Sequence, residues 1–597
     1  MELNFGIMGR SAKERQIAAA APFRLAILGD FSAGANKGRL DTGDDLARRK
    51  PLRVDVDNID QIIQRLDISV SLPLAEGAVE FAIGSMDDFH PDQIYEKVEL
   101  FSSMADLRRQ LSSKSSFPAA AKQLTQWRQE KLPQRPAPTP RRPRGATVPL
   151  GGKLSDFAAL IGQPSAEPDA VEVAVADLLK SVVTPYIVAA KDMQQAALVQ
   201  RLDRALAVTM RNVLHHPDFQ ILESLWRSVD LLTRRIETST KLQLVLYDCS
   251  AEEFAADLAA SDTIEDTGLY KWLVEQPALD AGQGALSAMV GAYVFDETPP
   301  QAELLGRMGK LAMRANAPFI ASISPEFLET KPEDVHPLIK EAWDELRGLP
   351  EARYLALVTP RYLLRQPYGT RTDPINVFDD FEEFTRKTGL QGMLWGNPAF
   401  IAGMLLGQSF AKEGPRMNLG AMLTVGDMPY YFYEDEDGDQ TALPCTERLI
   451  NERVAARIKS EHFAPMLSMK ERPEVRLGGF VSLAGTLLQG RWPADGGAPK
   501  KKTDDDEEPP PKKKKAKPKA EDEEPSEGET EEAAAPAEGE SEAAAEPESS
   551  GDADLDSLLA SLKDTEETKD AESTEAAAAE GEDGDMDPEL AKLLKGL

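Results

Sequence analysis

The sequence predicts an α/β protein in which two α/β parts pack together, followed by an acidic tail. Short apolar or alternating segments recur between segments whose apolar residues follow the helical period. A proline-rich stretch interrupts this alternation once, and the composition changes sharply near residue 494. Strands that alternate with helices are typical of an α/β layer, and 597 residues are too many for one core. We therefore expect two such layers joined by a linker.

The first α/β part is expected over residues 22–130, after an N-terminal extension at residues 1–21. It begins with an apolar strand, Phe23–Leu28, that runs into Gly29-Asp30. Another element is expected to begin at Val54–Val56, followed by a helix over Ile59–Leu66 capped by Asp57 or Asn58. The elements expected next are an alternating strand over Ala78–Ile83, a turn begun by Asp87 or Asp88, and a helix from Pro91 through Ile94, Val98 and Leu100.

Residues 131–153 are expected to form a linker. Six prolines and four arginines lie between Leu132 and Leu150. Such a composition does not suit the interior of a helix or a sheet and favours an extended basic connection.

The second α/β part is expected over residues 154–493. Apolar stripes predict helices over Leu178–Val183, Leu198–Leu214 and Phe219–Arg235, the last of them capped by Asp218. Strands are predicted over Lys241–Tyr247, Met289–Phe295, Ala317–Ile323 and Tyr354–Val358.

Residues 494–597 predict a disordered, acidic, low-complexity tail. From Lys500 onward the chain has 33 acidic and 13 basic residues, a net charge of −20 out of −33 for the whole chain. A segment this polar cannot bury enough apolar surface to order itself. Two short amphipathic helices are expected within it, near residues 554–563 and 587–596. Their leucine spacing is typical of segments that dock into a groove, although chance clusters in a solubilising tail are an equal alternative.

Charge and cysteine content exclude several classes of function. A net charge of −33 disfavours binding to a nucleic-acid backbone. The two cysteines, Cys249 and Cys445, form no disulfide framework, which favours a reducing compartment. No apolar run reaches the ~18 residues of a membrane span, and residues 1–21 lack the apolar core of a secretory signal. We expect a soluble, cytoplasmic protein without membrane insertion.

The motifs that resemble known sites predict no catalytic, cofactor or metal residues. Gly29–Gly38 has the glycines of a phosphate loop, but Ala35-Asn36 stand where that loop needs lysine and a hydroxyl residue. Glu434–Asp439 is acidic like a calcium loop, but Pro444 occupies the position of the bidentate glutamate. An exposed turn between Tyr431–Tyr433 and Thr441–Leu443 is the better interpretation.

The histidines and cysteines also fit structural roles better than chemical ones. His215-His216 has no third ligand at a metal spacing, and three of the five histidines (90, 215, 216, 336 and 462) directly precede a proline. Helix capping and turns explain this pattern. Neither cysteine has an evident histidine partner for nucleophilic work.

Two sets of motifs resemble known families. In the first half, the ordered segments Phe23–Asp30, Val54–Asp60, Ser85–Asp92 and Leu107–Leu111 resemble the small subunit of the contractile sheath of type VI secretion systems, the TssB, VipA or ImpB family. In the second half, about residues 170–486 resemble the large subunit, the TssC, VipB or ImpC family. The segments that carry this second resemblance are His215–Phe219, Ala317–Ala321, Ala352–Tyr354, Pro360–Gly369, Leu394–Ala399 and Cys445–Glu447.

The resemblance implies a structural, non-enzymatic protein with no cofactor. Proteins of this family stack as rings around an inner tube, so the implied partners are further copies of the chain, the inner-tube protein, baseplate components and an AAA+ unfoldase that recycles the sheath. Two departures are notable. The two subunits are joined here, which fixes their ratio and raises their effective concentration. The large-subunit part stops near Trp492, short of the family's C-terminal segment, whose strands neighbouring subunits lend to one another.

Two other functions stay open at this point. One is a non-contractile relative that caps, nucleates or adapts the sheath and recruits partners through its tail. The other is a nucleotide-dependent enzyme that uses the Gly29–Gly38 loop.

Overall fold

The computed structural model describes residues 22–74, 78–129, 146–148, 175–184, 195–279, 284–377, 381–385, 389–434, 440–470 and 472–493. The N-terminal extension, most of the linker and the acidic tail lie outside these ranges, and so do the two amphipathic segments expected in the tail. None of the helices in the described ranges combines the length and the apolar character needed to cross a membrane.

The main sheet has nine strands in the order β11-β15-β14-β8-β7-β6-β1-β5-β2. Neighbouring strands from β14 to β5 run parallel, whereas β2 at one edge and β15 and β11 at the other are antiparallel. The strands are β1 (Phe23–Gly29), β2 (Leu52–Val54), β5 (Leu242–Asp248), β6 (Ala288–Phe295), β7 (Phe319–Ile323), β8 (Leu355–Thr359), β11 (Thr424–Val425), β14 (Ala464–Ser468) and β15 (Val475–Leu477).

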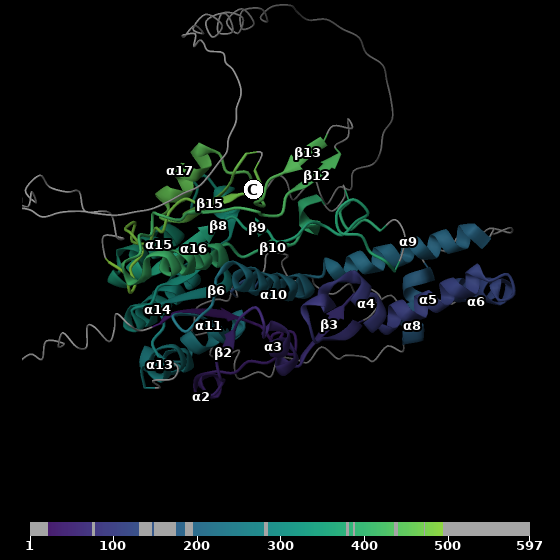
Figure 1. Ribbon diagram of the computed structural model, residues 1–597, viewed down its shortest axis with the longest axis horizontal. Coiled ribbons are helices and arrows are strands. Elements are labelled where there is room, and N and C mark those ends of the chain that lie inside the picture. The colour runs from purple at the N-terminus through teal and green to yellow at the C-terminus, as the bar shows by residue number, and fades with distance from the viewer. Residues whose placement is uncertain are drawn as a thin grey trace, which may run out of the picture. The chain divides into compact units, whose positions relative to one another are not determined.

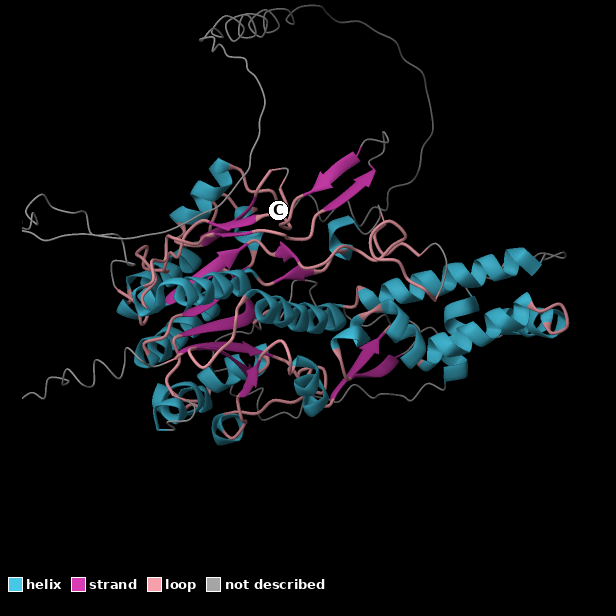
Figure 2. Cartoon of the chain, viewed as in Figure 1, coloured by secondary structure: helices cyan, strands magenta, loops and turns pink. Residues whose placement is uncertain are grey.

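Both faces of the central strands are buried, which explains their nearly continuous apolar sequences. Alternate residues of β1 enter different cores: Leu25 and Ile27 lie in one, and Ala26 and Leu28 in the other. Figure 2 shows the sheet strands among the helices that cover them. The α/β class predicted from the sequence is confirmed.

The helices that cover one face of the sheet include α10 (Pro217–Arg235) and α16 (Pro398–Glu413), and α16 contacts β6, β7 and β8. The other face carries α11 (Ala251–Ala259), α14 (Pro299–Ala315) and α15 (Pro337–Gly348). The other α-helices are α2 (Gly43–Ala47), α3 (Ile59–Leu66), α4 (Pro91–Lys97), α5 (Glu99–Ser112), α6 (Phe117–Gln129), α8 (Val175–Val183), α9 (Gln195–Leu214), α12 (Gly268–Tyr270), α13 (Gln276–Leu279) and α17 (Glu452–Ser460).

Three two-stranded sheets and several short helical turns complete the described part. The small sheets are β3 (Ile68–Pro73) with β4 (Ala78–Ile83), β9 (Tyr362–Leu363) with β10 (Trp395–Gly396), and β12 (Tyr431–Glu434) with β13 (Gln440–Leu443). The turns are η1 (Met86–Phe89), η3 (Ile264–Asp266), the π-helical η4 (Lys271–Glu275), η5 (Pro325–Leu328), η6 (Pro350–Tyr354), η7 (Gly389–Gly392) and η8 (Gly414–Arg416). Figure 1 labels most of the helices and strands, among them α5, which contacts α6, α8 and α9.

Three details of the predicted helices are wrong. The helix expected from Pro91 to Leu100 is two helices, because Val98 adopts an extended conformation between α4 and α5. The cap expected at Asp218 is His216, whose Nδ1 accepts a hydrogen bond from the Asp218 amide. Asn58 precedes α3, but its side chain accepts from the Asp55 amide rather than from the helix.

A short piece of the expected linker takes part in the main sheet. The Val148 amide donates to the Val294 carbonyl and the Val294 amide donates to the Ala146 carbonyl, each at 3.0 Å, in a parallel bridge. Gln301 of α14 donates to the Val148 carbonyl at 3.1 Å. Since β1 pairs with β6 only as far as Gly291, this piece occupies the next part of the same strand edge.

Candidate functional site: the seam between the two halves

We call the contacts between residues 22–129 and residues 195–493 the seam. Its centre is β1, which lies between β5 and β6 of the second half with its register running from Phe23 opposite Leu242 to Gly29 opposite Asp248. Arg24 adds a side-chain hydrogen bond to Gln243 at 2.8 Å. The two halves therefore share one sheet, a closer association than packing alone.

The loop after β1 docks on a carboxylate of the second half. The Ser32 amide and hydroxyl donate to the two carboxylate oxygens of Asp248 at 3.0 and 2.7 Å. Arg39 donates to Asp248 at 2.7 Å and to the Ser32 hydroxyl at 2.8 Å. These bonds tie the end of β1 to the end of β5 on the side of the sheet where both strands finish.

A second group of charges continues the seam around α11. Arg49 bonds to both carboxylate oxygens of the fully buried Glu253 and to Asp41. Glu253 also accepts from the Asp41 amide at 3.0 Å and from the amide of Ser250, whose hydroxyl caps α11. Because one carboxylate from the second half collects donors from both halves, Glu253 makes the position of α11 depend on residues 41–49.

The contact between α2 and α12 is close enough to require glycine. Asp257 accepts hydrogen bonds from the amides of Gly43, Gly268 and Leu269 at 2.6, 3.0 and 2.7 Å. A Cβ atom on Gly268 would lie 2.2 Å from the carbonyl oxygen of Gly43. Burial raises the pKa of Asp257, and the three amides oppose that shift.

Asp30 fills the loop that resembles a phosphate-binding loop. Its two carboxylate oxygens accept from the amides of Gly34 and Ala35 at 2.5 and 2.9 Å. Burial, reinforced by the negative charge of Asp248, raises the pKa of Asp30 to about 7, although the two amides and Arg39 oppose the shift. Amide donors that a phosphate would need are thus bound by a side chain of the loop itself.

Apolar contacts form the part of the seam next to α10. Phe31 packs edge-on against Trp226, with ring centroids 5.4 Å apart, and accepts a hydrogen bond from the indole through its carbonyl. Phe81 and Phe89 lie 6.0 and 5.9 Å from Phe219. The hairpin β3–β4 and η1 therefore cover the first turns of α10.

Polar bonds hold the first half at both ends of this apolar contact. Asn36 bridges the halves by donating to the Ser71 carbonyl at 2.9 Å and to Asp218 at 3.0 Å. Asp92 accepts from the amides of Asn376 and Val377 at 3.0 and 3.2 Å. Further out, α5 is tied to α9 by the Arg108–Asp203 ion pair at 2.6 Å.

A buried ionic cluster in the second half supports the face of α10 that the seam uses. Arg365 lies 2.8 Å from Glu223 and 2.7 Å from Glu383, and all three side chains are at most 10% exposed. Burial opposes ionisation of Glu383, but the charge and hydrogen bonds of Arg365, with His215 3.7 Å away, lower its pKa to about 2. Arg365 also stacks over the Tyr368 ring at 4.0 Å.

The histidines lie in capping and structural positions. His90, His216 and His336 each precede a proline and cap a helix, α4, α10 and α15 respectively, through Nδ1. His215 lies 3.7 Å from Glu383, and His462 contacts the Leu483 carbonyl. Across the described ranges no three histidine, cysteine or acidic side chains gather as a metal site would require.

Both cysteines are buried and free. Burial, with the nearby charge of Glu253, raises the pKa of the Cys249 thiol, and burial also raises that of Cys445. A raised pKa disfavours the thiolate that nucleophilic chemistry needs.

The strands that flank the acidic turn pair as the hairpin β12–β13, whereas residues 435–439 lie outside the described ranges.

Comparisons with known proteins match both halves to one apparatus. Residues 10–128 match the family described as "Type VI secretion system, VipA, VC_A0107 or Hcp2", and residues 196–484 match "EvpB/VC_A0108, tail sheath N-terminal domain". The chain is also similar to the type VI secretion system sheath protein TssC1 of Pseudomonas aeruginosa strain PAO1, with 30% identity over 354 residues. The matched region covers 55% of this chain and 71% of that relative.

Proposed function

This chain belongs to the sheath proteins of type VI secretion systems and joins a small-subunit part to a large-subunit part in one polypeptide; from that premise we propose that it is a single building block that polymerises around an inner tube. The two parts are residues 22–130 and 154–493, and residues 131–153 connect them. As a member of this family the chain is a structural component that assembles with further copies of itself.

The observation that carries the proposal is the position of β1. A strand paired on both sides within the sheet of the other half cannot leave without breaking two strand ladders. The two halves would therefore move together, as one body, whenever the lattice changes. The 1:1 ratio that separate subunits reach by binding is fixed here by the covalent chain.

We also assign the chain no covalent chemistry. Its work would be mechanical: a lattice with two arrangements of different energy releases the difference when it changes from one to the other. The internal ligation of the loop amides by Asp30 and the raised thiol pKa of Cys249 both favour this assignment over nucleotide or thiol chemistry. Titration calorimetry with ATP and with GTP should give no binding heat, and saturable binding of either would contradict the assignment.

The partners proposed beyond further copies are the inner-tube protein, the baseplate and an AAA+ unfoldase that recycles the sheath. The proposed location is the cytoplasm, which fits the two buried, free thiols of Cys249 and Cys445.

Electron microscopy tests the central proposal directly. The full chain is purified and imaged with and without the inner-tube protein encoded by the same organism. We expect rings or tubules that enclose the inner tube. Particles that stay monomeric with the inner tube under conditions where the tube itself polymerises would refute the building-block proposal.

A further inference from the structure

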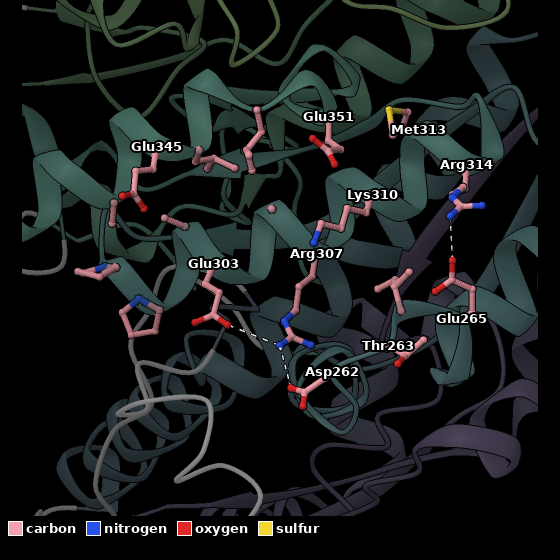
Figure 3. Close-up of a pocket in the computed structure, with 18 residues that line it drawn as sticks. Asp262, Thr263, Glu265, Glu303, Arg307, Lys310, Met313, Arg314, Glu345 and Glu351 are labelled. Carbon is pink, nitrogen blue, oxygen red and sulfur yellow. Dashed lines mark hydrogen bonds and ion pairs between the residues drawn. The ribbon is translucent and has the colours of Figure 1, made fainter.

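A groove on the surface of the second half is not used by the seam. It has a volume of about 980 Å³ and lies between α14 and α15, with η3 and η6 at its sides. Figure 3 shows the side chains that line it. The apolar lining residues include Ile264, Ala302, Met313, Ala342, Leu346 and Leu349. Leu349 is exposed, although it is large and apolar.

The charges along this groove are only partly neutralised. Arg307 pairs with Glu303 and Asp262, and Arg314 pairs with Glu265. Lys310, Glu345 and Glu351 have no hydrogen bond or ion pair among the described residues, and one carboxylate oxygen of Glu351 is buried without a partner. Lys310 stands on the α14 wall, whereas Glu345 stands on the α15 wall.

This arrangement suits an amphipathic helix of a particular kind. An apolar groove between two helices accepts the apolar stripe of a third. A helix half buried there would bring the two flanks of its stripe against the two walls. Its best match therefore has an anion on the flank that faces Lys310 and a cation on the flank that faces Glu345.

The sequence outside the described ranges contains two candidates with the same leucine spacing. Leu555, Leu558, Leu559 and Leu562 repeat at i, i+3, i+4 and i+7, and so do Leu590, Leu593, Leu594 and Leu597. This spacing predicts one apolar stripe on a helix. Both segments lie in the 104 residues that follow Pro493.

The charges separate the two candidates. At 100° per residue, Asp554 falls on one flank of the first leucine stripe, and Lys563 falls on the other flank together with Asp556. In the second segment both lysines, Lys592 and Lys595, fall on the face opposite the leucines. The charges on its two flanks are both acidic, Glu589 on one and Asp587 on the other, so no cation would face Glu345.

We propose that the groove between α14 and α15 binds the first leucine segment, Leu555–Leu562, of a second copy of the chain. Sheath proteins assemble with copies of themselves, so a neighbouring copy offers the same groove to this tail. The contact adds a link between copies that the seam does not provide, and it goes beyond the proposed function because a sheath can form with or without it.

The experiment uses the full chain with a photo-reactive residue in the tail. Leu559 is replaced by p-benzoylphenylalanine, and copies labelled with heavy and with light isotopes are mixed before irradiation. We expect cross-links between heavy and light copies that map to groove residues such as Met313. Cross-links confined to one copy, or mapping away from α14 and α15, overturn the proposal.

Two controls make the assignment specific. The same photo-reactive residue at Leu594 should cross-link to the groove much less, and equal cross-linking would contradict the choice of segment. Lys310→Glu should lower the yield from position 559 about threefold to fivefold, because an exposed ion pair is worth at most about 1 kcal/mol. Adding Asp554→Lys should restore it, and an unchanged yield in Lys310→Glu would contradict the role of the charges.

Tubules are scored by electron microscopy in the same samples. Loss of cross-linking with normal tubules overturns only the tail contact, whereas normal cross-linking without tubules counts against only the proposed function.

Discussion

Arg365 lies between two buried carboxylates, Glu223 and Glu383, and this shows how single residues of the second half are constrained. The guanidinium neutralises both acids and also donates to the Gln366 carbonyl. A buried ion pair contributes little net stability compared with apolar packing, but a buried charge that loses its partner is costly. The sensitive change is therefore the removal of the shared partner.

Replacing Arg365 by methionine should lower the free energy of unfolding by about 3–5 kcal/mol, because Glu383 would remain buried without its arginine and Glu223 would keep only Arg227. The measurement is urea denaturation of the full chain, followed by tryptophan fluorescence. Arg234→Met is the matched control: its ion pair with Asp230 is largely exposed on the arginine side, and its loss should cost less than about 1 kcal/mol. Similar losses in the two variants would contradict the role given to burial.

The raised pKa of Asp30 predicts that its contribution to the free energy of unfolding depends on pH with the opposite sign to that of most acids. Its pKa is raised to about 7, whereas an unfolded aspartate titrates near about 4. The stability that protonated Asp30 contributes is therefore fully present below about pH 4 and is lost as the pH rises through about 7.

Unfolding in urea between pH 4 and pH 7 tests this. As the pH rises, the unfolding free energy of the unmodified chain should fall relative to that of Asp30→Asn. Asp45→Asn, which removes an exposed carboxylate, should show no such trend. Parallel pH profiles for the unmodified chain and Asp30→Asn would rule out the raised pKa.

At the scale of elements, the local sequence pattern predicts many of the helices and strands. It misses elements whose identity depends on the elements packed beside them. The strand β3 was not predicted, although Ile68–Pro73 alternates buried and more exposed residues along its length and the signal was available. The strands β14 and β15 were also missed. They are short, and β15 pairs antiparallel with β14 and with the edge strand β11, so their identity depends on the strands beside them.

The helix break at Val98 and the cap at His216 illustrate another limit of sequence reasoning. Val98 suits a helical stripe as well as an extended joint, and only the packing of α4 and α5 decides between them. Histidine is not among the strongly preferred capping residues, so the aspartate two positions later was chosen instead. His90, His216 and His336 show that an imidazole nitrogen can accept the capping hydrogen bond from a helix amide.

Gly403 allows α16 to lie close to the sheet. A Cβ atom at this position would come within 2.6 Å of a methyl group of Val290 and 3.3 Å of one of Leu25. Gly403→Val should therefore push α16 from β6 and β1 and lower the free energy of unfolding by about 1–3 kcal/mol. Thermal unfolding followed by circular dichroism measures the change.

Gly348→Ala is the control for this prediction, because a Cβ atom there meets nothing within 4 Å and the residue has no positive φ. Its melting temperature should be unchanged or slightly raised. A Gly403→Val variant that melts like Gly348→Ala would show that the close approach does not limit α16.

At the scale of the molecule, the sequence indicated two halves but not how they join. The motifs placed a small-subunit part before a large-subunit part, and both families match. The seam could not be predicted, because Ser32 and Asp248, or Arg49 and Glu253, are more than 200 residues apart and nothing local marks them as partners. The same holds for β1, whose apolar sequence fits any central strand.

Cutting the linker should leave the two halves together. A protease site inserted within residues 131–145 allows cleavage of the folded chain, and the fragments should then elute as one species on gel filtration. They should separate only at the urea concentration that unfolds them, because leaving would break both ladders of β1. Uncut chain carrying the same insertion is the control. Fragments that separate without denaturant would show that the linker, rather than the shared sheet, holds the halves.

The central place of β1 also governs the order in which the protein can mature on the ribosome. Its two neighbours, β5 and β6, are translated about 200 residues or more later, an interval of roughly 10 s or more at ~5–20 residues per second. During that time the nascent segment carries an apolar strand with no edge to join. Such a segment is a natural client for a chaperone, and joining two genes into one makes every copy of the product pass through that wait.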